Sequence, residues 1–399
     1  MSIGDTSIAA PGPAPRAAPR ATAGRQDAAE RAAWLFHPLV DFLCLGGGSL
    51  IVMTLLLTME PSRELMIGVA ATALLLANVL NHPHFANSYQ IFYRNFRRKL
   101  LGPDYGPVLR LRYFVAGLLV PAALIGFFAV SLQRGDARML GLGGNLMLFL
   151  VGWHYVKQGY GMLIVDSVLK RRFFAPHEKK ILLANAYACW ILYWLLANWL
   201  VSEHALQGLT YYSFAVPAGL VYAAMAAAGA TGAAALAVLA RKCAKEGAKA
   251  PINGVVAYLV TLYLWVLFGR LDPLLLLLVP AFHSLQYLVV VWRFQLNYES
   301  SRADAAERPG EGRLARFAPP TAALRFAAFV TIGVALGYVG FWGAPQWLAS
   351  LVPYDQDVFG ASLYLFVFWI FINVHHYFLD NVMWRRENPD TGRYLFAHG

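Results

Sequence analysis

Residues 273–292 read PLLLLLVPAFHSLQYLVVVW. This 20-residue stretch contains no Asp, Glu, Lys or Arg, and its length is what an α-helix needs to cross a hydrocarbon core of about 30 Å. Backbone amides find no water inside such a core, so a continuous apolar run of this length predicts a transmembrane helix. One histidine, His283, interrupts the run near its middle. The stretch therefore indicates a membrane protein with a polar group placed deep in the bilayer.

The composition of the whole chain agrees with this interpretation. Of its 399 residues, 58% are apolar and only 14% are charged, whereas about 25% of the residues of an average soluble domain are charged. A soluble protein of this size does not cover its surface with so few charges. The same numbers exclude an intrinsically disordered chain, a collagen-like fibre and, with three cysteines, a small disulfide-bonded scaffold. The chain is expected to be a polytopic membrane protein.

Nine further apolar stretches of similar length recur along the chain. They occupy residues 39–58, 64–85, 112–132, 141–165, 181–201, 211–229, 252–269, 324–348 and 359–380. We therefore predict an all-α bundle of about ten transmembrane helices that forms a single domain over residues 34–385, with a cytoplasmic loop at 293–323. Residues 1–33 have the composition of a disordered basic tail and lack the apolar core of a secretory signal. Residues 386–399 are expected to be a second cytoplasmic tail.

The positive charges alternate between the connections of these ten stretches. The chain has 33 Lys and Arg against 22 Asp and Glu, a net charge of +11. With ten spans, 28 of the cations lie in the two tails, in the loops after spans two, four, six and eight, or in the first two residues of the spans that follow these loops. The opposite loops hold only Arg63, Arg134, Arg138 and Arg270. The positive-inside rule then predicts that both termini are cytoplasmic, and we expect the bilayer to be a bacterial inner membrane. Cations dispersed in this way form no single patch, so no nucleic-acid partner is expected.

The histidines are concentrated in four of the predicted spans. The sequence reads NHPHFAN at 81–87, WHYVKQ at 153–158, FHSLQY at 282–287 and NVHHYFLD at 373–380. These four spans run in the same direction, so their histidines fall in the middle or the cytoplasmic half of the bilayer. A single intramembrane histidine is more often structural than a ligand, but ionisable groups in a bilayer are costly and a whole layer of them favours a site. The expected metal ligands are His82, His84, His154, His283, His375 and His376.

Helical spacing places further polar residues beside these histidines. Residues three or four apart on a helix share a face, and a polar side chain at that distance can fix the tautomer of an imidazole and leave its other nitrogen free. Two more polar residues, His37 and Asp41, stand at the cytoplasmic entry of the first span. The expected orienting partners are Gln158, Gln286, Asn373, Asp41 and His37, and the expected catalytic groups are Lys157 and Asp380. Lys157 can alternatively extend its amine toward the cytoplasm with no further role.

Neutral imidazoles suit iron, copper or zinc, whereas magnesium and calcium prefer oxygen ligands. Six imidazoles and a carboxylate suffice for one or two ions, and we expect iron. A site at this depth suits the oxidation of a lipid or isoprenoid that enters sideways between helices, with electrons supplied by a separate donor. Three alternatives stay open: a transporter with a proton relay through His, Asp and Lys, an electron-transfer protein with haem b held between two histidines, and a non-catalytic scaffold.

The layout of the histidine-bearing segments resembles that of the integral-membrane di-iron desaturases, hydroxylases and related oxygenases, which also present histidine clusters at the cytoplasmic side. A looser likeness exists to the carotenoid-cleaving dioxygenases of microbial membranes, which are multi-helix proteins with dispersed histidines. The usual di-iron boxes, H-x(3–4)-H and H-x-x-H-H, do not occur in this sequence, and His375–His376 is its one adjacent pair. The resemblance implies an iron-dependent oxygenase or desaturase.

Overall fold

The computed structural model of the chain describes residues 33–200, 203–206, 209–306 and 321–396. Within these residues, ten helical segments are long and apolar enough to cross a membrane, as the sequence predicts. They are Pro38–Thr58, Arg63–Tyr93, Pro107–Gln133, Ala137–Leu169, Pro176–Leu200, Ala218–Lys249, Ile252–Leu271, Pro273–Arg302, Ala322–Leu351 and Leu363–Met383. The chain thus folds into a bundle of helices of the length and composition expected of a polytopic membrane protein.

Five of these segments contain one long helix each, and five are divided into two. The long helices are α9 (Ala137–Leu169), α10 (Pro176–Leu200), α11 (Ala218–Glu246), α14 (Val279–Ala306) and α18 (Leu363–Met383). The divided segments are α2 (Pro38–Phe42) with α3 (Gly48–Thr58), α4 (Arg63–Leu76) with α5 (Asn81–Tyr93), α7 (Pro107–Phe114) with α8 (Val120–Gln133), α12 (Ile252–Leu259) with α13 (Trp265–Leu271), and α15 (Ala322–Tyr338) with α16 (Ala344–Leu351). Three short helices, α6 (Phe96–Leu101), α17 (Gln356–Phe359) and α19 (Pro389–Leu395), lie in the connections.

The divisions have local causes. A π-helical turn separates α7 from α8 at Val115–Leu119 and another separates α15 from α16 at Val339–Gly343. In each case the second residue after the turn is a proline, Pro121 or Pro345, whose ring lacks the N–H that would continue a regular helix. Such turns leave backbone carbonyls without their usual helical partner, and side chains can use them.

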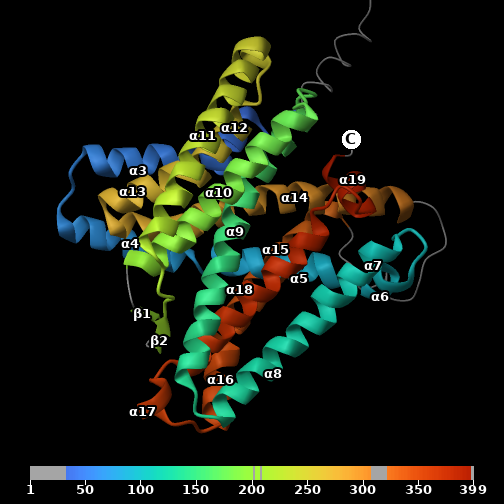
Figure 1. Cartoon of the computed structure of the whole chain (residues 1–399). Coiled ribbons are helices and arrows are strands. Elements are labelled where there is room, and N and C mark those ends of the chain that lie inside the picture. Colours follow the sequence, from blue (N-terminus) through green and yellow to red (C-terminus); the bar gives the residue numbers. More distant parts are fainter. Residues whose placement is uncertain (1–32, 201–202, 207–208, 307–320, 397–399) are drawn as a thin grey trace, which may run out of the picture.

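Two sets of helices cross in the bundle. Figure 1 shows α8, α9 and α18 running diagonally side by side, while α14, α5 and α15 cross that direction at a steep angle. Helix α5 packs against both α15 and α18, and α14 packs against α5, α9 and α15. The crossing brings the middle of α9 and α18 to the starts of α5 and α14. Residues that are far apart in sequence therefore meet at one level of the bundle.

The cation-rich connections gather at one end of the bundle, here called the cation-rich face. The Arg293 side chain donates hydrogen bonds to the backbone carbonyls of Leu35 and Leu395, so the two ends of the described chain lie beside each other. At the opposite end, Arg63 lies 3.9 Å from Asp272. Figure 1 accordingly shows α6, α7, α19 and the C-terminal end together at the right, with α17 and the strands β1 (Glu203–Leu206) and β2 (Leu209–Tyr212) at the lower left.

Three boundaries differ from the sequence prediction. The sixth span, predicted at 211–229, is the later and longer helix α11, because the aromatic residues of the antiparallel hairpin β1–β2 extend the apolar signal before it. Helix α14 continues to Ala306 into the predicted loop 293–323, and the buried Glu299 on it forms an ion pair with Arg325 at 2.7 Å. The predicted C-terminal tail 386–399 contains α19, and the predicted basic tail 1–33 lies outside the described residues except for residue 33.

Candidate metal centre

Four helices each bring one histidine to the crossing point of the bundle: α5, α9, α14 and α18 carry His84, His154, His283 and His376. All four side chains are buried, with exposed fractions between 1% and 8%. Helix α5 can start here because Pro83 lacks the N–H that would extend α4 through it. Two glycines of α15 let α5 approach, since a Cβ at Gly337 would lie 2.8 Å from the backbone of His82 and one at Gly333 would lie 2.1 Å from Asn87 Oδ1.

Three of the four imidazoles point their ring nitrogens at one another. His376 Nε2 lies 2.9 Å from His84 Nε2 and 3.4 Å from His154 Nε2. One ligand atom from each of the three residues falls within 4.8 Å of the others. We call His84, His154 and His376 the histidine trio.

The spacing of the trio matches that of ligands on a metal ion. With metal–nitrogen bonds of about 2.0–2.1 Å and angles of about 90–110°, neighbouring ligand nitrogens lie about 2.9–3.4 Å apart. The two short separations of the trio fall in this range. Hydrogen bonds alone explain the trio less well, because His376 Nε2 can donate one proton at most and faces two imidazoles. The donor set is therefore suited to a cation at the position where the three nitrogens converge.

The far nitrogen of His84 is held by a serine. Ser284 Oγ donates its hydrogen to Asn81 Oδ1 at 2.9 Å and lies 3.2 Å from His84 Nδ1. Since the serine hydrogen is already used, the Nδ1–H of His84 donates to Ser284 Oγ. This tautomer leaves the lone pair of His84 Nε2 directed at the other two imidazoles. It is the arrangement that a metal-binding histidine requires.

A carboxylate of α18, that of Asp380, lies beside the trio. Asp380 Oδ2 lies 3.4 Å from His376 Nε2 and 3.8 Å from His154 Nδ1. Its other oxygen accepts a hydrogen bond of 2.8 Å from the Tyr287 hydroxyl. That hydroxyl lies 2.7 Å from Ser88 Oγ and also accepts from Trp384 Nε1 at 3.2 Å. Asp380 thus has one oxygen toward the trio and one held in a buried hydrogen-bond network.

His283 lies beside the trio without joining it. Its ring stacks on Tyr155 with centroids 3.7 Å apart, and its centroid is 4.9 Å from that of His154. Among the described residues, neither ring nitrogen of His283 has a hydrogen-bond partner, although both are buried. Buried polar atoms are normally satisfied. The imidazole therefore offers two unused nitrogens next to the cluster, where a water, an ion or a substrate group can bind.

The structure does not bring the other two predicted ligands, His82 and His375, into the cluster. The His82 ring stacks on Phe341 with centroids 4.1 Å apart, so it faces α15 and the turn that follows it. His375 has its own partners: Nε2 lies 2.9 Å from the carbonyl oxygen of Ala116, and Nδ1 lies 2.9 Å from the Tyr89 hydroxyl. Ala116 belongs to the π-helical turn before α8. His375 therefore fastens α18 to that turn.

Lys157 and the two predicted glutamines lie near the cluster but contact other groups. The Lys157 amine donates to Asn381 Oδ1, and it interacts with Asp380 only at longer range. Gln158 Nε2 donates to the backbone carbonyl of His283 at 2.9 Å and to Gln286 Oε1 at 3.1 Å. Gln286 Nε2 in turn donates to the Leu45 carbonyl at 2.6 Å. The glutamines join the backbones of three helical segments and touch no imidazole nitrogen of the trio.

The remaining predicted partners have local structural contacts. Asn373 donates to the carbonyl of Trp369, one turn earlier on α18. His37 caps the start of α2 and accepts from the Leu39 amide. The buried Asp41 carboxylate accepts from three backbone amides, including that of Leu35 at 2.6 Å. The contacts of His37 and Asp41 hold the start of α2 at the cation-rich face, and the contact of Asn373 stays within α18.

The sequence analysis assigns no role to four residues of the site: Ser284, Asn81, Tyr287 and Ser88. Their spacing in the sequence could have indicated them. Asn81 and Ser88 lie three and four residues from His84 on α5, and Ser284 lies three residues from Tyr287 on α14, so each pair shares a helix face. What the sequence does not give is which face of α14 turns toward α5. The contacts of Ser284 and Tyr287 decide this: their face meets His84 and Asp380, and His283 points toward Tyr155 instead.

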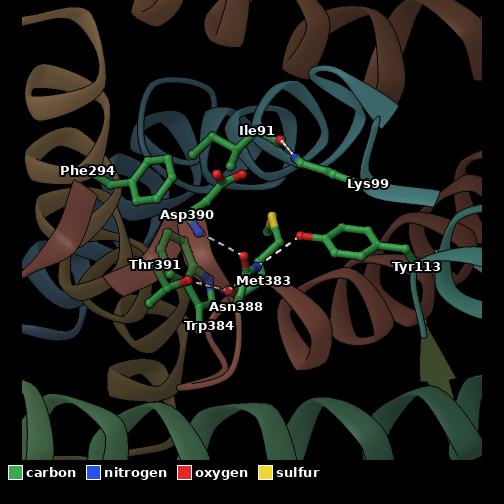
Figure 2. Close-up of a pocket in the computed structure, with 9 residues that line it drawn as sticks. All are labelled: Ile91, Lys99, Tyr113, Phe294, Met383, Trp384, Asn388, Asp390 and Thr391. Carbon is green, nitrogen blue, oxygen red and sulfur yellow. Dashed lines mark hydrogen bonds between the residues drawn. The ribbon is translucent and has the colours of Figure 1, made fainter. Parts of the chain in front are cut away.

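A small pocket lies at the cation-rich face, beyond Trp384. It is lined by Ile91, Lys99, Tyr113, Phe294, Met383, Trp384, Asn388, Asp390 and Thr391. Figure 2 shows the Lys99 amine on the carbonyl of Ile91, and this hydrogen bond is 2.6 Å long. Burial is the main reason that the pKa of Lys99 falls to about 8, while the charge of Asp390 opposes that fall. The pocket is separate from the trio but shares Trp384 with its hydrogen-bond network.

Comparison with known proteins gave no match: no protein-family model, no curated protein and no solved structure is significantly similar to this chain.

Proposed function

We propose that this protein is a metal-dependent membrane oxidoreductase that binds iron at His84, His154 and His376. The observation that supports it is the convergence of the three ligand atoms within 4.8 Å, inside the apolar bundle. Nitrogen ligands with one nearby carboxylate are typical of non-haem iron, which is bound by histidines and a carboxylate with positions left for oxygen and substrate. When bound, the iron supplies one-electron redox chemistry and activates dioxygen.

The depth of the site supports an apolar substrate. The trio belongs to spans that cross the bilayer, and an apolar molecule can reach it sideways between helices without leaving the membrane. A lipid or an isoprenoid is the substrate class that fits this route. Each cycle of such an oxidation also needs electrons from a separate donor. These assignments extend the expectation from the sequence, with the ligand set reduced from six histidines to three.

The other residues of the site take roles that follow from their contacts. Ser284 holds His84 in the tautomer that leaves Nε2 free, and Asp380 faces both His376 and His154. The Tyr287 hydroxyl donates to Asp380, so a proton can move between these two groups. His283, with two unbonded nitrogens, is the residue we assign to hold a water or a polar group of the substrate.

Two of the three alternatives, the haem protein and the proton-relay transporter, differ in how well they fit the contacts of the trio. A haem between His84 and His154 would need a flat space between them, but His376 Nε2 lies within 3.4 Å of a nitrogen of each. The haem reading therefore does not fit this trio. A proton relay does fit the contacts, because His154, His376, Asp380 and Tyr287 form one connected polar chain. It is the second candidate function, and it requires no metal.

The orientation of the protein in the membrane follows from the uneven distribution of Lys and Arg between the two ends of the bundle. We infer that the cation-rich face lies in the cytoplasm, with both termini, because cytoplasmic connections carry the excess of Lys and Arg. In a bacterial cell the bilayer would be the inner membrane. A cysteine-labelling experiment with a membrane-impermeant reagent on intact cells tests this. Ser301→Cys should be protected, and Ser350→Cys should be labelled.

The test of the function is the metal content of anaerobically purified protein, together with its visible spectrum. About one iron per chain without the strong absorption band of haem is the expected result. A full complement of zinc and no iron would overturn the redox assignment. Protein that stays metal-free after incubation with ferrous iron, and that carries protons when reconstituted in vesicles, would replace the oxidoreductase by the proton-relay function.

A further inference from the structure

A continuous row of aromatic rings leads from the histidine trio to the cation-rich face. The Tyr287 ring lies 4.5 Å, centroid to centroid, from His84, and the Trp384 ring lies 5.9 Å from Tyr287. The row then continues through Phe294, Tyr394 and Tyr298, with centroid separations of 5.6, 5.4 and 5.2 Å. We call these five side chains the aromatic row. Every step is within the range of direct aromatic contact.

The two ends of the row have different surroundings. Tyr287 is 3% exposed and is surrounded by helices, whereas Tyr394 and Tyr298 are half-buried and reach the edge of the protein. Arg94 lies 3.9 Å above the Tyr298 ring, and Arg393 lies 5.4 Å from the Tyr394 ring. Between the ends, Phe294 and Trp384 line the small pocket at the cation-rich face (Figure 2). The row thus joins a buried polar site to the water-facing end of the bundle.

Tyr287 has the contacts that a redox-active tyrosine needs. Removing one electron from a phenol makes its hydroxyl strongly acidic, so the oxidation is easy only where a base can take the proton at the same time. Asp380 Oδ1 stands 2.8 Å from the Tyr287 hydroxyl and accepts its hydrogen. Trp384, the next ring in the row, donates its indole N–H to the same hydroxyl. Both the proton acceptor and the electron donor of Tyr287 are therefore in place.

We propose that the aromatic row is an electron relay between the cation-rich face and the histidine trio, with Tyr287 and Trp384 as its redox-active members. This proposal rests on the proposed function, since it assigns the path by which an oxidised metal ion at the trio recovers an electron. A soluble one-electron reductant in the aqueous phase is the donor. The relay also explains why two large polar aromatics, Tyr287 and Trp384, are joined to each other and to Asp380 inside the bundle.

The transfer is balanced in electrons and protons. Tyr287 gives up one electron toward the trio, where a bound metal ion would accept it; the O–H bond of Tyr287 breaks, and its proton forms an O–H bond with Asp380. Trp384 then reduces the Tyr287 radical with one electron, and Asp380 returns the proton to the phenolate oxygen. Tyr394 gives one electron to Trp384 through Phe294 and releases its hydroxyl proton to water. The external reductant then returns one electron to Tyr394, and water returns the proton. The net change is one electron lost by the reductant and one gained by the metal.

The relay can be tested without any metal. Protein stripped with EDTA is illuminated with tris(bipyridine)ruthenium(II) and persulfate, which oxidise aromatic side chains from the aqueous phase, and the radicals are trapped by freezing and measured by electron paramagnetic resonance. The expected result is a tyrosyl signal that Tyr287→Phe removes. Trp384→Phe should lower the yield of this signal by about tenfold, which corresponds to about 1.4 kcal/mol in the activation barrier.

Trp292→Phe is the matched control, because Trp292 lies on α14 two residues before Phe294 and has no ring contact with the row among the described residues. An equal yield in the Trp384→Phe and Trp292→Phe proteins would overturn the relay, as would a signal unchanged by Tyr287→Phe in a protein that keeps its helical circular dichroism. The iron content of the unstripped wild type is measured in parallel. Iron without a Tyr287 radical overturns the relay alone, and a Tyr287 radical in a protein that binds no metal overturns the proposed function alone.

Discussion

His375 and His376 are neighbours on α18, and they stand in two different regions of the molecule. His376 has its Nε2 within 3.4 Å of two other imidazoles and has an Nδ1 with no partner among the described residues. His375 has each nitrogen within 2.9 Å of an oxygen, one from the Ala116 backbone and one from Tyr89. Successive residues of a helix point about 100° apart, so the pair must face different partners. From this difference we infer a criterion for histidines in membrane spans. A histidine is structural when oxygen atoms hydrogen-bond both of its ring nitrogens, and it is a ligand candidate when other imidazole nitrogens lie near its own.

The largest expected effect is the loss of metal from the trio. His84→Ala and His376→Ala should each lower the affinity for iron by more than about 100-fold, because even changes to residues that only orient ligands cost about 10–100-fold. Iron content after gel filtration, measured by mass spectrometry, checks this. His375→Ala is the matched control and should retain its iron. Equal losses in His375→Ala and His376→Ala would remove the distinction between the two regions.

A second test compares the polar neighbours of His376 on its own helix. Asp380 lies 3.4 Å from His376 Nε2, whereas Asn373 bonds to the backbone of Trp369. We expect Asp380→Asn to weaken iron binding by about 10–100-fold and Asn373→Ala to leave it nearly unchanged. Titration of the metal-free proteins with ferrous iron under nitrogen measures both affinities. A larger effect of Asn373→Ala would contradict the placement of Asp380 at the site.

The structural role of His375 predicts a loss of stability instead of a loss of metal. His375→Phe leaves the Ala116 carbonyl and the Tyr89 hydroxyl without this partner, and an unsatisfied buried polar group costs about 1–3 kcal/mol. The melting temperature in detergent should therefore fall, while the iron content stays at the wild-type level. A melting temperature equal to that of the wild type would show that α18 does not depend on this contact.

A smaller effect is expected from the serine that holds His84. Ser284→Ala removes the acceptor of the His84 Nδ1–H, so iron affinity should fall by about tenfold, at the lower end of the range for groups that orient ligands. The control is Ser131→Ala, a buried serine whose hydroxyl donates to the Phe127 carbonyl of its own helix. The same affinity in both variants would mean that Ser284 does not select the tautomer.

A last effect, on stability instead of metal binding, concerns the cation-rich face. The pKa of Lys99 is lowered to about 8 by burial, while a lysine in an unfolded chain titrates near 10.4. Between these values the unfolded chain binds more protons, so this group adds stability as the pH rises from about 8 to 10. The melting temperature of the wild type relative to Lys99→Met should rise over this range. A difference that stays constant or falls would contradict the lowered pKa.

Much of the fold could be predicted from the sequence because the bilayer imposes a simple rule on it. Ten apolar stretches of about 20 residues and an alternation of cations suffice to predict the number of spans and their two-sided arrangement. The misplaced sixth span, predicted at 211–229, shows the limit of hydropathy. The predicted span begins at Tyr211 in strand β2 and stops at residue 229, whereas α11 begins at Ala218 and continues to Glu246.

The sequence predicts which helices carry the candidate site, but it does not predict which of their histidines converge. Depth along each span placed histidines of four helices at one level, and four of the six proposed ligands do meet at or beside one point. His82 and His375 do not, although each is close in sequence to a member of the trio. Whether a residue faces a neighbouring helix depends on how each helix is rotated about its axis, and spacing along one helix carries no information about that rotation.

The amino-acid sequence alone predicts ten helical spans with polar groups concentrated in four of them, because hydropathy and charge act on each segment separately. The packing of the helices, and not the sequence pattern, shows which imidazoles converge. It also shows that Ser284 and Asp380 lie beside these imidazoles and that the aromatic row leads away from them. These contacts join residues of α5, α9, α14 and α18 that are up to 292 positions apart. They depend on the crossing angles and rotations of packed helices, which are properties of the whole bundle.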